Sequence, residues 1–100
     1  MIENMISFAT VIAIEGKYVC CELEMHSVEE SLQMKSSEKE NVIVEIPLEQ
    51  VTFEIGEGDI LVIEHSDETI IMIHGKDEEE YQRRKIRMEE RYKALLAMIG

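Results

Sequence analysis

Two short apolar runs in the C-terminal half constrain the fold most strongly. Residues 60–63 read Ile-Leu-Val-Ile, and residues 70–73 read Ile-Ile-Met-Ile, with a polar stretch between them. Apolar runs of this length, bounded by turn residues, predict the two strands of a hairpin. Successive side chains of a strand point to opposite faces, so both faces of this hairpin are apolar and both need cover.

A turn centred on residues 66–67 would pair these two strands. In that register Val62 faces Ile71 and Ile60 faces Ile73 on one side of the hairpin. The other side is apolar as well, so one face can join a sheet interior while the second needs a separate cover. The chain that follows is the nearest candidate for that cover.

An amphipathic helix is predicted over residues 77–98. Asp77 is a favourable N-cap, and Glu80 three residues later gives the spacing of a capping box. Apolar residues then recur at helical spacing, with the stem of Lys85 in the one gap. They are Tyr81, Met88, Tyr92, Leu95 and Ile99. We expect this helix to fold back over the second apolar face of the hairpin.

The same spacing has a second interpretation. Positions 81, 85, 88, 92, 95 and 99 alternate by four and three, which is also the pattern of a coiled-coil seam. A homodimer formed through the helix therefore stays open. In either case the candidate partner-binding surface comprises Val62, Ile71, Ile73, Tyr81, Met88, Tyr92 and Leu95.

The N-terminal half predicts three more strands. Residues 6–14 alternate, with large apolar side chains on one face, and a turn at 15–17 leads into a strand over 18–25 that gives the hairpin a clear inside. Residues 26–41 form a polar loop with one helical turn around 28–34. Residues 42–48 form a third strand that Pro47 ends.

These elements predict one domain over residues 1–100, with a β region at about 6–74 and a helix at about 77–98. The class is mainly β with a C-terminal α-helix (α+β). The architecture is a small antiparallel five-stranded barrel or rolled sheet closed by the helix.

Charge narrows the possible partners. The chain carries 22 acidic and 10 basic side chains, a net charge of −12, which repels nucleic-acid backbones and anionic membranes. The basic residues gather in the helix, where Arg84, Arg87 and Arg91 form one stripe. Our interpretation is a solvated face with ion pairs such as Glu80–Arg84 and Glu79–Arg83. The alternative is a docking site for an acidic partner or an RNA backbone.

The candidate chemical groups give no catalytic pattern. Cys20 and Cys21 are adjacent, so in a strand they point to opposite faces and form no ordinary disulfide. The three histidines, at 26, 65 and 74, are too scattered to share a metal, and we expect ordinary surface or edge positions for them. Glu22 and Glu24 are interpreted as a solvated face. Sequence motifs for a metal, a cofactor or a catalytic nucleophile are absent, so we expect no enzyme.

No stretch reaches the roughly 20 apolar residues that a membrane span needs. The first residues, Met-Ile-Glu-Asn-Met, lack the basic start of a signal peptide. We therefore expect a cytoplasmic protein with no membrane partner.

Three phrases together resemble a small bacterial family catalogued as domain of unknown function 3006. They are IEGKYVCCELE (14–24), VEIPLEQVTFEIGEGDILVI (44–63) and DEEEYQRRKIRMEERYKALL (77–96). The long loop at 26–41 departs from the family, which usually has a tight acidic turn there. The resemblance implies a small β domain with a helix and supplies no catalytic residues.

The sequence thus favours a non-enzymatic protein-interaction or regulatory module. The alternative is a small-barrel nucleic-acid-binding protein that uses the basic stripe of the helix, against which the net charge and the few aromatic residues argue.

Overall fold

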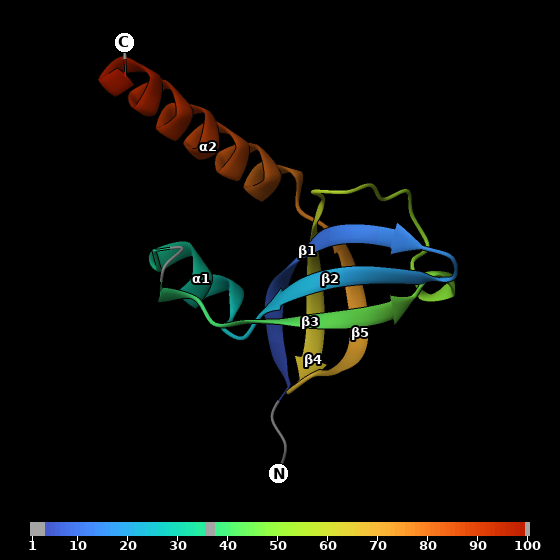
Figure 1. Ribbon diagram of the computed structural model, residues 1–100. Coiled ribbons are helices and arrows are strands. Elements are labelled where there is room, and N and C mark those ends of the chain that lie inside the picture. The colour runs from blue at the N-terminus through green and yellow to red at the C-terminus, as the bar shows by residue number, and fades with distance from the viewer. Residues whose placement is uncertain (1–3, 36–37, 100) are drawn as a thin grey trace.

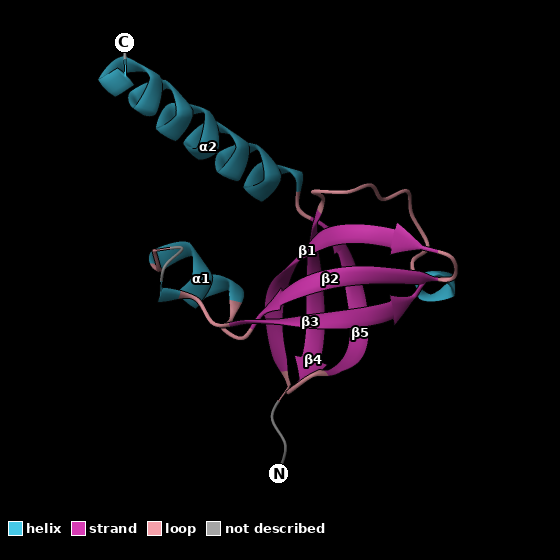
Figure 2. Ribbon diagram, in the orientation of Figure 1, coloured by secondary structure: helices cyan, strands magenta, loops and turns pink. Residues whose placement is uncertain are grey.

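The computed structural model describes residues 4–35 and 38–99. In these residues five antiparallel strands form one sheet, and two α-helices lie outside it (Figures 1 and 2). The strands are β1 (Met5–Glu15), β2 (Tyr18–Glu24), β3 (Asn41–Pro47), β4 (Ile60–Ser66) and β5 (Thr69–Lys76). The helices are α1 (Val28–Gln33) and α2 (Glu78–Ile99), with a 3₁₀ turn, η2 (Leu48–Gln50), after β3.

The sheet has the order β3-β2-β1-β4-β5, with β1 in the centre and β3 and β5 at the edges. Every neighbouring pair is antiparallel. The prediction of five antiparallel strands and a C-terminal helix is confirmed. The sheet curls over its own interior, but its edge strands do not pair with each other in the described ladders, so it is an open rolled sheet and not a barrel.

The interior face of β1 is the opposite of the one that the large side chains suggest. Ala9 and Val11 are buried in the core, whereas Ile6 and Ile12 are exposed on the outside. Phe8 lies on the same outer face and is buried there beneath the guanidinium of Arg84. Ala9 lies opposite Leu23 of β2 and Leu61 of β4 at once. The central strand of a tightly curled sheet has room only for small side chains on its concave face, which explains the reversal.

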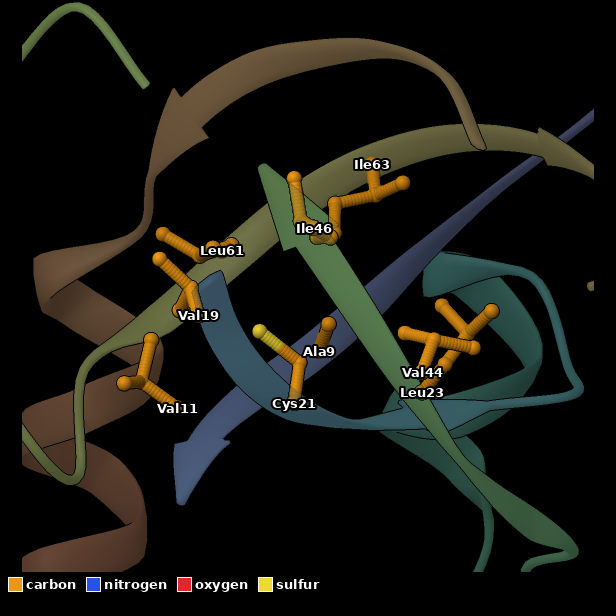
Figure 3. Packing of buried hydrophobic residues seen from close by; sticks show 9 residues of the cluster. All are labelled: Ala9, Val11, Val19, Cys21, Leu23, Val44, Ile46, Leu61 and Ile63. Atoms are coloured by element: carbon orange, nitrogen blue, oxygen red, sulfur yellow. The ribbon is translucent and has the colours of Figure 1, made fainter. Parts of the chain in front are cut away.

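A single core fills the concave face (Figure 3). Figure 3 shows Ile46 of β3 close to Ile63 of β4, and Val19 of β2 close to Leu61, so the two halves of the sheet cover each other. Val51, Phe53 and Ile55, from the connection between β3 and β4, pack at its margin. The inner face of the last hairpin therefore needs no helix to cover it.

The pairing of the last hairpin differs from the predicted register. Ser66 pairs with Thr69, His65 with Ile70 and Ile63 with Ile73, and two irregularities interrupt the ladder. The turn is Asp67-Glu68, one residue later than predicted. Asp67 has a φ of 50°, and aspartate tolerates this left-handed region better than most residues.

The helix α2 does not cover the outer face of this hairpin. It leaves the sheet at its first turns and points away from it (Figure 1). Ile71 and Met72 remain about half exposed. The prediction that α2 is a lid on Val62, Ile71, Ile60 and Ile73 is therefore wrong within this chain for all but Ile60, which is 3% exposed and lies beside the root of the helix.

The polar loop contains the expected short helix, α1. Ser27 is its N-cap, and its hydroxyl accepts from the backbone N–H of Glu30 at 3.2 Å, while the Glu30 carboxylate accepts in return from the N–H of Ser27 at 3.4 Å. His26 Nε2 accepts from the N–H of Glu40 at 3.1 Å, which fastens the two ends of the loop. The loop thereby brings α1 beside β1.

Cys20 and Cys21 are free thiols on opposite faces of β2, as predicted. Burial, and to a smaller degree the neighbouring Cys20, raises the pKa of Cys21 from 9.0 to about 11. The thiolate is the reactive form, so Cys21 is protected both by its position and by its proton.

We predict that only one thiol of the native protein reacts with a thiol-specific disulfide reagent at pH 8, and that the second reacts after unfolding. Replacing Cys20 with serine should leave no reactive thiol in the native protein and one in denaturant. Equal reaction rates of both thiols in the native protein would contradict the burial of Cys21.

Candidate functional site

The root of α2 is built directly on the sheet. The backbone N–H of Asp77 donates to the carbonyl of Ile60 at 2.8 Å, which continues the β4–β5 ladder to the first residue of the turn. The Asp77 carboxylate then accepts from the N–H of Glu80 at 2.9 Å, so it is the predicted N-cap. The ring of Tyr81 packs against Gly58, and a Cβ atom added to Gly58 would lie 3.7 Å from that ring. The start of the helix is therefore fixed in position and direction.

Arg84 is the centre of a cluster of charged groups that holds the second turn. Its Nε donates to Glu80 at 3.0 Å, and its Nη2 lies 2.8 Å from a carboxylate oxygen of Glu24 on β2. The guanidinium also lies over the ring of Phe8 on β1, 5.2 Å from the ring centre. Lys39 adds a second cation at 3.3 Å from Glu24. One arginine thus joins α2 to both β1 and β2.

The two carboxylates of this cluster, those of Glu24 and Glu80, are buried. The sequence pattern does not predict burial for either of them. The side chains of Glu24 and Glu80 are 3% and 1% exposed. The prediction of a solvated face is wrong for Glu24, because Arg84 and Lys39 cover it. A buried carboxylate that loses its cation is left uncompensated at a large free-energy cost, so the cluster makes the docking geometry of α2 specific.

The basic stripe of α2 is divided by this cluster. Arg84 is used within the chain, with its side chain 23% exposed, and Arg87 lies 3.8 Å from Glu80. Arg83 forms ion pairs with Glu79 and Glu80, which lie one turn earlier on the same helix. Arg91 lies beyond the cluster and is exposed. The helix therefore faces the sheet with its charged side, and its apolar stripe is turned elsewhere.

The rest of α2 is uncovered. Every side chain from Lys85 to Ile99 is exposed. Large apolar groups occur along this whole stretch. Met88, Tyr92 and Leu95 belong to the predicted partner-binding surface, and Ile99 belongs to the predicted coiled-coil seam. The exposed large apolar residues of α2 are Ile86, Met88, Tyr92, Leu95, Leu96, Met98 and Ile99. Several of these side chains follow one another closely near the end of the helix, and large exposed apolar patches mark interaction sites.

The predicted binding residues of the hairpin are not gathered with those of the helix. Val62 is half-buried on the outer face and lines a groove of about 650 Å³ between β1, the start of α1 and the root of α2. Ile71 lies exposed on the edge strand, and Ile73 packs at the margin of the core. Tyr81 lies at the root of α2. Of the predicted binding residues, Met88, Tyr92 and Leu95 therefore belong to the free part of the helix.

The histidines lie apart from this surface. The expectation of a surface position is wrong for His65, which is 1% exposed. Its Nδ1 lies 2.7 Å from the carbonyl of Asp67, to which it donates, and its Nε2 lies 2.8 Å from the hydroxyl oxygen of Ser7. Ser7 is also fully buried, so no substrate reaches this pair. The two groups satisfy each other and fix the turn between β4 and β5.

Among residues 4–35 and 38–99, no three His, Cys, Asp or Glu side chains gather in a way that could hold a metal ion. Within the same residues, no helix is both long and apolar enough to cross a bilayer.

Comparison of the chain with protein-family models, with curated proteins and with solved structures found no match. The resemblance to domain of unknown function 3006 stays a prediction.

Replacing Arg84 with leucine tests the cluster. Glu24 and Glu80 lose a buried cation, and the ring of Phe8 loses the guanidinium that lies over it. We therefore expect a loss of about 3 kcal/mol in the free energy of unfolding, measured by urea denaturation. The matched control is Arg91→Leu, the same change at an exposed position, with an effect within about 0.5 kcal/mol. Equal effects of the two substitutions would show that the cluster does not anchor the helix.

Proposed function

We propose that this protein is a non-enzymatic protein-interaction module and that α2 is its binding element. The observation that carries the proposal is the uncovered part of α2, residues 85–99, which presents seven large apolar side chains to solvent. Burial of apolar surface is the dominant favourable term in most protein–protein association. A helix that presents such a surface recognises a groove or a second helix.

The rigid root of α2 supports this proposal. Asp77, Glu80 and Arg84 fix the first two turns, so the free part extends from a defined point in a defined direction. A binding element that is already ordered loses less conformational entropy when its partner binds than a disordered tail does. The sheet then acts as the support that presents the helix.

The alternative of nucleic-acid binding has less support. It needs Arg84, Arg87 and Arg91 as a stripe of three cations, and Arg84 is held by two carboxylates of its own chain. We propose a cytoplasmic location, where the thiols of Cys20 and Cys21 stay reduced.

A comparison of tagged baits tests the proposal. The baits are the wild-type protein, Leu95→Glu on α2 and the control Ile43→Glu on β3. Each of the two variants replaces an exposed apolar side chain. Glutamate is nearly as good a helix former as leucine, so α2 itself is preserved. After cross-linking, quantitative mass spectrometry should find at least one protein, copies of this chain included, that is lost with Leu95→Glu and retained with Ile43→Glu. Identical sets for all three baits would refute the role of α2.

A further inference from the structure

The last part of α2 is apolar on all sides. Residues 94–99 read Ala-Leu-Leu-Ala-Met-Ile, whereas the preceding turns mix apolar with charged residues. A helix that lies on one surface needs a single apolar stripe, and a helix that is apolar all round is buried on all sides in its functional state. Met98 and Ile99 are instead 85% and 83% exposed. The end of α2 therefore requires enclosure, and not merely contact along one face.

A groove of suitable chemistry lies on the same molecule. It has a volume of about 650 Å³, and its apolar lining includes Met5, Ile6, Val28 and Val62. Ile6 is 44% exposed there although it belongs to the central strand. The groove is large enough to receive several aliphatic side chains.

Acidic groups border this groove. Glu29 and Asp77 line it, and Glu64 lies opposite Ile6 in the sheet. Hydrogen bonds from His74 and Asn4 lower the pKa of Glu64, so that it remains a carboxylate at neutral pH. An occupant that carries apolar and basic groups together fits this site.

The apolar end of α2 has this combination, because Arg91 and Lys93 directly precede it. Six of the ten basic residues lie within residues 83–93, where Glu89 and Glu90 are the only acids, so this segment carries a net charge of +4. The chain as a whole has a charge of −12, which leaves −16 on the remaining residues. The basic segment 83–93 and the acidic border of the groove attract each other across an interface between two copies.

The end of α2 cannot fill the groove of its own chain. Asp77, at the root of the helix, is itself part of the groove lining. The 22 residues of α2 span roughly 33 Å at 1.5 Å per residue, so its apolar end is held far from that groove. The anchoring cluster around Arg84 prevents the helix from turning back.

We propose that the occupant of the groove is the apolar end of α2 from a second copy of this chain, in a two-fold symmetric exchange. The inference rests on the proposed function, since it names the partner of the same helix. Each copy has one such end and one such groove, so reciprocal insertion satisfies both sites of both chains and closes the assembly at two copies. Because each groove lies at a helix root, the two α2 helices run antiparallel from one body to the other.

This arrangement accounts for the two different parts of the free helix. In the middle, the stripe of Met88 and Tyr92 faces the partner's helix and the charged side faces solvent. At the end, Leu95 and Met98 lie between the partner's helix and the partner's groove, so all sides are covered. The uncovered part of α2 is then an interface that a single chain cannot complete.

Sedimentation equilibrium of the full chain tests the exchange with three matched substitutions. Met98→Glu alters the end of the helix, Ile6→Glu alters the groove, and Ile43→Glu alters an exposed apolar site elsewhere on the sheet. The wild-type protein should form a dimer of twice the 11.6 kDa chain mass. Met98→Glu and Ile6→Glu should each raise the dimer dissociation constant by at least about tenfold, while Ile43→Glu changes it by less than about twofold.

Mixing the two weakened variants makes the test specific to exchange. An Ile6→Glu chain keeps a normal helix end, and a Met98→Glu chain keeps a normal groove, so one of the two sites is intact in the mixed dimer. The mixture should associate more tightly than either variant alone. A circular dichroism spectrum like that of the wild type, recorded for each variant, ensures that the folded chain is compared.

Three results would overturn the exchange. The first is a wild-type protein that stays monomeric up to high micromolar concentration, whether or not a different protein binds α2. The second is a dimer that Ile6→Glu leaves unchanged, because that dimer would use helix pairing without the groove. The third is a monomer that binds phosphatidylglycerol vesicles through Met98. If the bait comparison still finds a partner that depends on α2, the proposed function stands; if neither experiment finds one, both proposals are wrong.

Discussion

The ion cluster around Arg84 is the interaction on which the arrangement of the whole protein depends. Its guanidinium contacts Glu80 one turn earlier, Glu24 on a neighbouring strand and the ring of Phe8. These contacts turn the charged side of α2 toward the sheet and direct its apolar stripe away from it. A helix anchored by packing alone could rotate to bury its apolar stripe, whereas here rotation would leave two buried carboxylates without a cation.

The rolled sheet makes this outward helix compatible with a stable body. Small side chains such as Ala9 on the concave face of β1 allow the sheet to curl, so that β3 and β4 bury each other's apolar residues. The core is then complete without α2. The helix is free to serve an interface, and the outer face of β1 and β4 keeps an apolar groove beside the helix root.

Much of the fold follows from local patterns in the sequence, and the exceptions have physical causes. Alternation and turn residues predict the five strands, and Asp77 predicts the start of α2. The predicted interior face of β1 is wrong because the true one depends on the curvature of the sheet, which no local pattern encodes. The predicted direction of α2 is wrong because an apolar stripe of this kind can pack either on its own sheet or on a partner. The burial of Glu24 depends on Lys39 and Arg84, which lie far from it in the chain. The capping box formed by Ser27 and Glu30, by contrast, is a local signal that indicates the start of α1.

A paramagnetic label near the end of α2 tests the central claim, that this helix is directed away from its own sheet and toward another copy. The label is placed by Ala97→Cys in a Cys20→Ser background, where Cys21 is too deeply buried to react. In one sample, labelled chains are mixed with unlabelled, isotopically enriched ones. In a second sample, chains that are both labelled and isotopically enriched are diluted among chains that are neither. The account predicts broadened amide signals of Ile6 and Val62 when the label is on the other chain, and no broadening from a label on the same chain. Broadening within a single chain would contradict it.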